Sequence, residues 1–259
     1  MPASKPEAFT FQSISSITIL QSVCNYSWKM YLSGVTIVSL AGVDSEQAVE
    51  AILYSQLSIK FAEAKIISPL RPSNLTPNIV WEEIDPLPLR SPGEDPYSKF
   101  MIYELWRYID TEHCLVVQGD GFVINPKKWS QRFLEYDYVG APWPLRNDAF
   151  IDPFGSHQRV GNGGFSLRSK KLLEVPRHTE IPWDVNQGNF YKHMDVGLLH
   201  EDGNICVHNR HLYEEAGCVF APTKVAAKFS QEIFVPEARW VRPFGFHRHK
   251  PRFWRSFFP

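Results

Sequence analysis

The first clear pattern of apolar and polar positions predicts a buried strand followed by a helix. Residues 35–40 are an apolar, β-branched run that ends in a turn at residues 41–43, which is typical of a strand covered on both faces. Asp44 offers a helix cap, with Gln47 three residues further on. The apolar positions that follow at helical spacing are Ala48, Val49, Ile52, Leu53 and Leu57.

Weaker patterns predict further elements up to the middle of the chain. Residues 65–68 and 78–84 are expected to be short strands, and a proline-rich stretch at residues 86–96 ends the second of them. Asp95 and Pro96 then form a helix-start signal. The apolar stripe of that helix comprises Phe100, Met101, Leu105, Tyr108 and Ile109.

The centre of the chain indicates where a ligand would bind. Residues 114–117 form a continuous apolar run, as expected of a buried strand, and the run stops at the polar cluster of residues 118–121. Ligands of open α/β sheets bind at the carboxyl ends of the strands, so the position of Asp120 singles it out.

Glycine and proline mark loops in the second half of the chain, at residues 141–144 and 161–164. Residues 204–216 are expected to form a helix that closes at Gly217, and residues 218–221 a late strand. Because strands and helices alternate without an internal repeat, the chain is predicted to be an α/β protein with one sheet and covering helices.

Composition and charge exclude several classes of protein. Of the 259 residues, 44% are hydrophobic and 14% aromatic, which is enough to bury a core. Lys and Arg number 27 and Asp and Glu 28, a net charge of −1, so no strong field favours nucleic acid as a partner. The four cysteines include no C-x-x-C pair, which disfavours structural zinc and secretory disulfides.

The sequence lacks the usual membrane and export signals. No apolar run is long enough to cross a bilayer, and residues 1–11 lack the order of a signal peptide. The protein is therefore expected to be cytoplasmic, with no transmembrane segment. Residues 242–259 mix cations with aromatic rings. They are interpreted either as a segment packed on the domain or as a site for phosphate, an acceptor or a membrane surface.

Four common nucleotide-binding or catalytic motifs are missing from the sequence. The glycine cluster at residues 161–164 does not continue as G-x-G-x-x-G, no G-x-x-x-x-G-K-[ST] phosphate loop occurs, and His200-Glu201 lacks the second histidine of H-E-x-x-H. A G-x-S-x-G elbow is also missing. Rossmann dehydrogenases, P-loop enzymes, zincins and the common serine hydrolases are therefore disfavoured.

The remaining candidates for chemistry are carboxylates and one late histidine. A carboxylate and an imidazole can hold a divalent ion that also binds a diphosphate, while another carboxylate takes a proton from an acceptor hydroxyl. Sugar transfer from a nucleotide sugar needs both functions, because the diphosphate leaves as the acceptor oxygen attacks. The candidate residues are Asp120, Glu201, Asp202 and His247.

Each candidate also has a structural interpretation, which the sequence leaves open. Asp120 lies between glycines and suits a turn. The acidic pair at residues 201–202 suits a helix cap, and His247 suits a packed histidine. An aromatic residue such as Trp143 lies more often in the core than under a sugar, and Asn162 beside glycines suits a tight turn.

Two long and specific sequence blocks stand out in the second half of the chain. They are Gly-Ala-Pro-Trp at residues 140–143 and Gly-Asn-Gly-Gly-Phe-Ser-Leu-Arg at residues 161–168. Further blocks occur in order at residues 35–38, 42–43, 99–100, 118–122, 136–139, 201–202, 220–222 and 243–247. Together these blocks resemble a largely uncharacterised family of glycosyltransferase-like domains. The resemblance covers residues 34–249, between an extension at residues 1–33 and a basic, aromatic tail at residues 250–259.

The resemblance implies a GT-A type fold with a mixed, mostly parallel central sheet, and it implies roles for the candidates. Asp120 would stand where related enzymes keep a metal-binding D-x-D motif, from which Gln118 departs, and His247 would be the second ligand of Mn²⁺ or Mg²⁺. Asp202 would be the catalytic base, with Glu201 as the substitute. The residues expected to meet the nucleotide, donor sugar or acceptor are Gly42, Val43, Lys99, Gln118, Gly119, Trp143, Asn162, Gly163 and Gly164.

Three functions remain open at this point. The first hypothesis is an inverting, divalent-metal-assisted glycosyltransferase. It would move a sugar from a nucleotide-diphosphate donor, with a UDP-sugar favoured, to a glycan acceptor in surface polysaccharide or glycoprotein synthesis. The second is a non-catalytic carbohydrate- or nucleotide-binding module, and the third is a nucleotidyltransferase, which would release pyrophosphate. Residues 1–33 are interpreted as a partner-binding or self-association segment, or as an added strand and helix.

Overall fold

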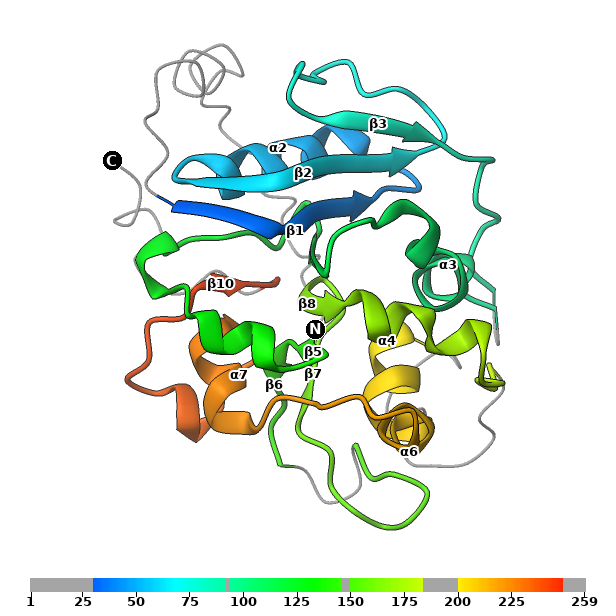
Figure 1. Ribbon diagram of the computed structural model, residues 1–259, viewed down its shortest axis with the longest axis vertical. Helices are drawn as coiled ribbons and strands as arrows, with labels where there is room; N and C mark the ends of the chain where they lie inside the picture. The colour runs from blue at the N-terminus through cyan, green and yellow to red at the C-terminus, as the bar shows by residue number, and fades with distance from the viewer. Residues whose placement is uncertain (1–29, 92–93, 146–149, 184–199, 249–259) are drawn as a thin grey trace, which may run out of the picture.

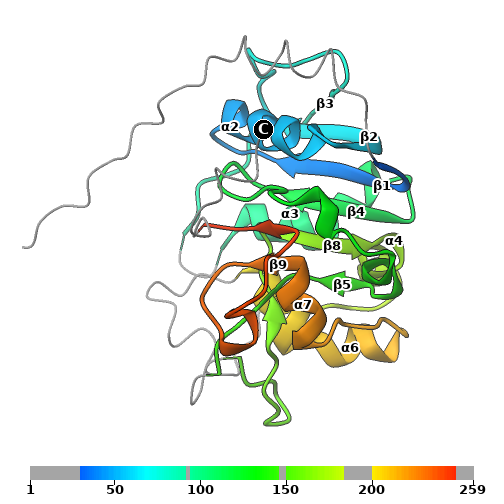
Figure 2. The same ribbon diagram turned by 90° about the vertical axis from the view of Figure 1, so that its left-hand side faces the viewer.

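A six-stranded mixed sheet forms the centre of the protein. The computed structural model describes residues 30–91, 94–145, 150–183 and 200–248. The strand order is β3-β2-β1-β4-β8-β5 (Figure 2). The first four of these strands are parallel, β8 is antiparallel to β4, and β5 is antiparallel to β8. Their bounds are β1 Met30–Leu40, β2 Ile59–Ser68, β3 Val80–Glu83, β4 His113–Val117, β5 Tyr138–Val139 and β8 Phe165–Ser169.

Helices cover both faces of the sheet, and the two faces bury separate apolar cores (Figure 1). Successive side chains of a strand point to opposite faces of the sheet. In β4, Leu115 and Val117 therefore lie in one core, while Cys114 and Val116 lie in the other. Helices α2 (Ser45–Gln56) and α7 (Thr223–Phe229) belong to the first core. Helices α3 (Pro96–Tyr103), α4 (Lys170–Glu174) and α6 (Arg210–Glu215) belong to the second. Within the described ranges, no helix has the length and apolar character that crossing a membrane requires.

Two small sheets lie beside the central one. Strand β6 (Ala141–Pro142) pairs with β7 (Val160–Gly161), and β9 (Ser230–Gln231) pairs with β10 (Gly245–Phe246). After β10 the chain lies next to the segment that follows β4, because the backbone N–H of Arg248 donates to the carbonyl of Asp120 over 2.9 Å. The late residues therefore lie next to the carboxyl end of β4.

The strongest patterns of the sequence are confirmed. Helix α2 is capped by Asp44, whose carboxylate accepts the backbone N–H of Gln47 over 3.1 Å, and α3 is capped in the same way by Asp95. The run at residues 114–117 lies in β4, the segment at residues 65–68 is the end of the longer β2, and the segment at residues 78–84 contains β3. The mixed, mostly parallel α/β sheet is also as expected.

One expectation for the second half is confirmed only in part, and another is wrong. The helix expected at residues 204–216 is divided into a π-helical turn (Asn204–His208) and α6, which closes at Gly217 as predicted, and α5 (Glu201–Gly203) precedes them. The break occurs because the N–H of Asn209 donates to the carbonyl of Asn204, five residues back, and its side chain is held by Pro182. Residues 218–221 form no strand but only a single bridge to β5, and Pro222 ends the segment. The expectations for residues 1–29 and 249–259 lie outside the described residues.

Candidate active site

The carboxyl end of β4 and the start of β8 bring the candidate residues together. After Val117, residues 118–121 make a tight turn in which the N–H of Gly121 donates to the carbonyl of Gln118 over 2.8 Å. Strand β8 runs antiparallel to β4 and pairs Phe165 with Val117. The glycine loop at residues 161–164 therefore lies at the same edge of the sheet as the turn after β4, which is the ligand-binding edge of such sheets.

One half of the site joins Asp120 to His247. Nε2 of His247 lies 3.3 Å from Oδ1 of Asp120 and 3.1 Å from Oε1 of Gln118. Its Nδ1 lies 3.3 Å from a carboxylate oxygen of the buried Glu232. Burial alone would lower the pKa of His247, but the contacts with Asp120 and Glu232 outweigh it and raise the pKa to about 9. Without a metal ion the two carboxylates therefore favour the protonated imidazole, and a metal ion bound at Nε2 would take the place of that proton.

The donor set at this half fits a divalent cation. A metal-binding histidine commonly gives its other ring N–H to a carboxylate, which is the relation of Nδ1 to Glu232. Nε2 then faces the Asp120 carboxylate and the Gln118 amide oxygen, both suitable ligands for Mn²⁺ or Mg²⁺. Across the described residues, no group of three or more His, Cys, Asp and Glu side chains forms a metal site. The two predicted ligands, Asp120 and His247, thus lie together, and the amide oxygen of Gln118 lies beside them.

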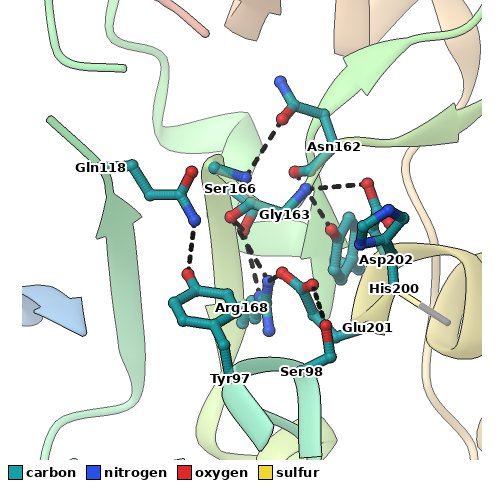
Figure 3. A network of polar contacts seen from close by, with 12 residues as sticks. Tyr97, Ser98, Gln118, Asn162, Gly163, Ser166, Arg168, His200, Glu201 and Asp202 are labelled. Carbon is teal, nitrogen blue, oxygen red and sulfur yellow. Dashed lines mark hydrogen bonds and ion pairs between the residues drawn. The ribbon is translucent and has the colours of Figure 1, made fainter. Parts of the chain in front are cut away.

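The other half separates the two acidic residues of α5. Asp202 is partly exposed, and its carboxylate accepts the N–H of Gly163 over 3.1 Å and the N–H of Gly203 over 2.8 Å. Glu201 is only 4% exposed and pairs with the fully buried Arg168 over 3.2 Å (Figure 3). The expectation that Glu201 could substitute as base is corrected here, because its carboxylate is committed to a buried ion pair. Asp202 is the accessible carboxylate.

Residues 161–164, called the glycine turn from here on, connect the two halves of the site through the adjacent Gly163 and Gly164. A Cβ at Gly163 would lie 1.8 Å from Oε1 of Glu201, and a Cβ at Gly164 would lie 2.2 Å from Nε2 of His247. Asn162 before them adopts φ +72°, and its Oδ1 accepts the N–H of Gly164 over 3.1 Å. The turn needs glycine at both positions because it packs directly against both candidate groups.

The other predicted binding residues are distributed around this edge. Val43 is 95% exposed just beyond β1, next to Gly42. Gly119 packs against Gln47. Lys99 forms an ion pair with Glu94, and its amine lies 5.2 Å from the ring centre of Trp183.

Trp143 does not fit the role expected of a sugar platform. Its side chain is 3% exposed, and its ring stacks on Phe150 with centroids 4.3 Å apart. A Cβ at Gly161 would lie 1.8 Å from the same ring. The structure places Trp143 in the core, which corrects the prediction for this residue.

The N-terminal turn of α3 contributes residues that the sequence did not single out. Nε2 of Gln118 donates to the hydroxyl of Tyr97 over 2.6 Å. The hydroxyl of Ser98 lies 3.0 Å from Oδ2 of Asp95 and 3.2 Å from Oε2 of Glu201, so the two carboxylates share its one proton. His200 lies 3.6 Å from the buried Asp95. The capping motif predicted Asp95 as a helix start, but no pattern linked it to residues a hundred positions further on.

Comparison with known proteins supports the fold and assigns a family. The structure is similar to that of the galactosyltransferase LgtC in complex with donor and acceptor sugar analogues, with a TM-score of 0.51, 16% identity, and coverage of 83% of this chain and 87% of that chain. An active-site mutant of LgtC aligns with a TM-score of 0.48 and 15% identity, over 83% of this chain and 88% of that chain. No curated protein sequence matches the chain.

The likeness to LgtC shows a fold of the GT-A glycosyltransferase type. A family model described as "Protein of unknown function (DUF5672)" matches residues 87–247, more than half of the chain. The match contains Asp120, the glycine turn, Asp202 and His247. The chain thus belongs to this family, DUF5672, whose function its description leaves open.

Proposed function

We propose that this protein is a glycosyltransferase that moves a sugar from a nucleotide-diphosphate donor to a hydroxyl of a glycan acceptor. The observation that carries the proposal is the double contact of the glycine turn. Gly164 lies against His247, which pairs with Asp120, and Gly163 holds Asp202. The proposed cation ligands and a partly exposed carboxylate therefore contact the same short turn, in a fold similar to that of a galactosyltransferase.

In this proposal Asp120 and His247 help to neutralise the charge of the leaving diphosphate. The bond between the anomeric carbon and the diphosphate oxygen breaks, and negative charge develops on that oxygen. The His247 imidazole, fixed by Glu232, is aimed at the same point as the Asp120 carboxylate. Mn²⁺ or Mg²⁺, when held by Asp120 and Nε2 of His247 with the Gln118 oxygen beside them, would supply charge neutralisation for the diphosphate.

In the same proposal Asp202 is the base that takes the proton of the acceptor hydroxyl. The acceptor oxygen forms its bond to the anomeric carbon as its proton passes to the Asp202 carboxylate. Each carboxylate oxygen accepts one backbone N–H, from Gly163 or Gly203, and keeps a lone pair for the proton. A base on the side opposite to the leaving group gives inversion at the anomeric carbon, which is the stereochemistry we propose.

The proposal also covers the nucleotide of the donor and the kind of glycan that is made. We favour a UDP-sugar, with the nucleotide placed near Gly42 and the exposed Val43 at the carboxyl end of β1. The product would be a surface polysaccharide or a glycoprotein glycan.

Transfer assays with matched variants test the proposal. Purified protein is incubated with a panel of nucleotide sugars, sugar acceptors and Mn²⁺, and the release of nucleoside diphosphate is measured. We expect Asp202→Asn to lower kcat by about 10²- to 10⁴-fold and Asp120→Asn to lower turnover as well. Glu135→Gln removes an exposed carboxylate paired with Arg132 and serves as the control that keeps full activity.

Three results would overturn the proposal. Unchanged turnover in both aspartate variants would remove their assigned roles. Release of pyrophosphate would indicate a nucleotidyltransferase, and binding of nucleotide without any turnover would indicate a binding module. The anomeric configuration of the product, measured by NMR, decides between inversion and retention.

A further inference from the structure

Arg168 is a cation buried directly beneath the glycine turn. It lies in β8 and has 0% of its surface exposed. It closes the Gly-Asn-Gly-Gly-Phe-Ser-Leu-Arg block, but neither the sequence patterns nor the proposed chemistry gives it a role. A buried charge is costly unless it is paired and hydrogen-bonded, so its contacts indicate what it does.

The guanidinium of Arg168 binds both the glycine turn and the residue next to the proposed base. Nη2 donates to the carbonyl of Gly163 over 3.4 Å and to Oε1 of Glu201 over 3.2 Å (Figure 3). Nε donates to the hydroxyl of Ser166 over 3.0 Å. The Tyr138 ring centre lies 5.5 Å from the guanidinium carbon. The side chain is thus held on several sides.

Glu201 transmits this arrangement to the base side. Its Oε1 packs so closely on the Cα of Gly163 that a Cβ there would lie 1.8 Å away. Its Oε2 accepts the hydroxyl of Ser98, which fixes it to α3. The Gly163 residue is therefore held at its carbonyl by Arg168 and at its Cα by Glu201. The third polar contact of Gly163 is made by its N–H, which donates to Oδ2 of Asp202.

We propose that Arg168 is a positioning residue for the transfer reaction, which acts through Gly163 and Glu201 to fix the carboxylate of Asp202. This inference rests on the proposed function. Buried ion pairs add little net stability compared with apolar residues of similar volume. The positioning of the base therefore explains the pair better than stability does.

A double variant separates positioning from folding. Arg168→Met combined with Glu201→Leu removes both charges and keeps similar volumes, so we expect a folded protein with a Tm close to that of wild type. We expect its kcat to fall by about 10- to 100-fold, with little change in KM for the donor. The amide of Gly163 should exchange its hydrogen about tenfold faster, or more, in NMR experiments.

Two further variants complete the test. Arg168→Lys keeps a cation for Glu201 but lacks the planar fork that reaches Gly163, Ser166 and Glu201 together, so it should fail to restore kcat. Arg168→Lys also keeps the positioning role testable if the double variant does not fold. Lys65→Met removes another buried cation, whose amine donates to the carbonyl of Tyr108 over 2.9 Å and otherwise pairs with carboxylates that lie outside the proposed site, those of Glu63, Glu82 and Asp110. It should alter stability but leave kcat and Gly163 exchange unchanged.

The outcomes distinguish this inference from the proposed function. A folded double variant with wild-type kcat and wild-type exchange at Gly163 would overturn the positioning role, and so would full activity in Arg168→Lys. If the wild-type protein transfers no sugar, the proposed function fails. The exchange measurement then still decides whether Arg168 and Glu201 hold the turn.

Discussion

Replacing Gly163 by alanine should damage the fold through one identified contact. The new Cβ would lie 1.8 Å from Oε1 of Glu201, whereas carbon and oxygen in contact are about 3.3 Å or more apart. Glu201 has little freedom to retreat, because it is buried, paired with Arg168 and bonded to Ser98. If the carboxylate stays, overpacking costs about 1–3 kcal/mol, and if it leaves, the broken buried ion pair costs about 3–5 kcal/mol.

We therefore expect Gly163→Ala to lose about 3 kcal/mol of unfolding free energy. For a protein of this size, 1 kcal/mol corresponds to about 2–4 °C in Tm, so Tm should fall by roughly 6–12 °C. Urea unfolding and calorimetry measure both quantities. Gly42→Ala is the matched control, because its Cβ would meet only Leu87 at 3.8 Å. It shares the loss of glycine entropy in the unfolded chain. Equal stability of the two variants would refute the steric argument.

Three other features give testable outcomes. Burial opposes both charges, yet the contact of His200 with Asp95 raises the pKa of His200 and lowers that of Asp95. His200 thus contributes stability that is present below its ordinary pKa of 6.5 and is lost as pH rises through the raised value. Urea unfolding at about pH 5.5 and about pH 8.5 should show a smaller difference for His200→Gln than for wild type, and an equal difference would contradict the pairing. Burial raises the pKa of the Cys114 and Cys218 thiols to about 12 and raises that of Cys206 as well. Native protein treated with a thiol reagent should remain unmodified at these cysteines by peptide mass spectrometry, and rapid labelling would show that they are accessible. Asp120→Asn should weaken Mn²⁺ binding measured by calorimetry, whereas Glu135→Gln should leave it unchanged; equal affinities would remove Asp120 as a ligand.

The elements that the sequence predicted well are those with a local cause. Asp44 and Asp95 cap α2 and α3 with their own side chains, and β4 is apolar on both faces because a helix layer covers each. Where tertiary contacts decide, the pattern misleads. The helical spacing of residues 204–216 continues through Asn209, but the side chain of Asn209 bonds to Pro182 and Asn204 and the helix breaks there.

The candidate site was predictable only in part for the same reason. A strand end and an acidic residue identified Asp120, but His247 lies far along the chain, and only the return of β10 brings it within 3.3 Å. The buried pair of Arg168 and Glu201 left no signal, since arginine and glutamate in a sequence normally indicate exposed positions. Trp143 was misjudged because an aromatic ring can stack on a sugar, although such residues lie more often in the core.

Equilibrium binding of a nucleoside diphosphate tests the proposed transferase site most directly. Calorimetric titration of UDP, and of the other nucleoside diphosphates if UDP does not bind, into the wild-type protein is carried out with Mn²⁺ and again with EDTA, and the same titrations are repeated on Asp120→Asn. The proposed site predicts saturable binding that is strong with Mn²⁺, is weakened by EDTA and is weakened equally by the substitution. Binding of equal strength under all of these conditions, or no binding of any nucleoside diphosphate, would contradict the placement of a metal-assisted nucleotide site at Asp120 and His247.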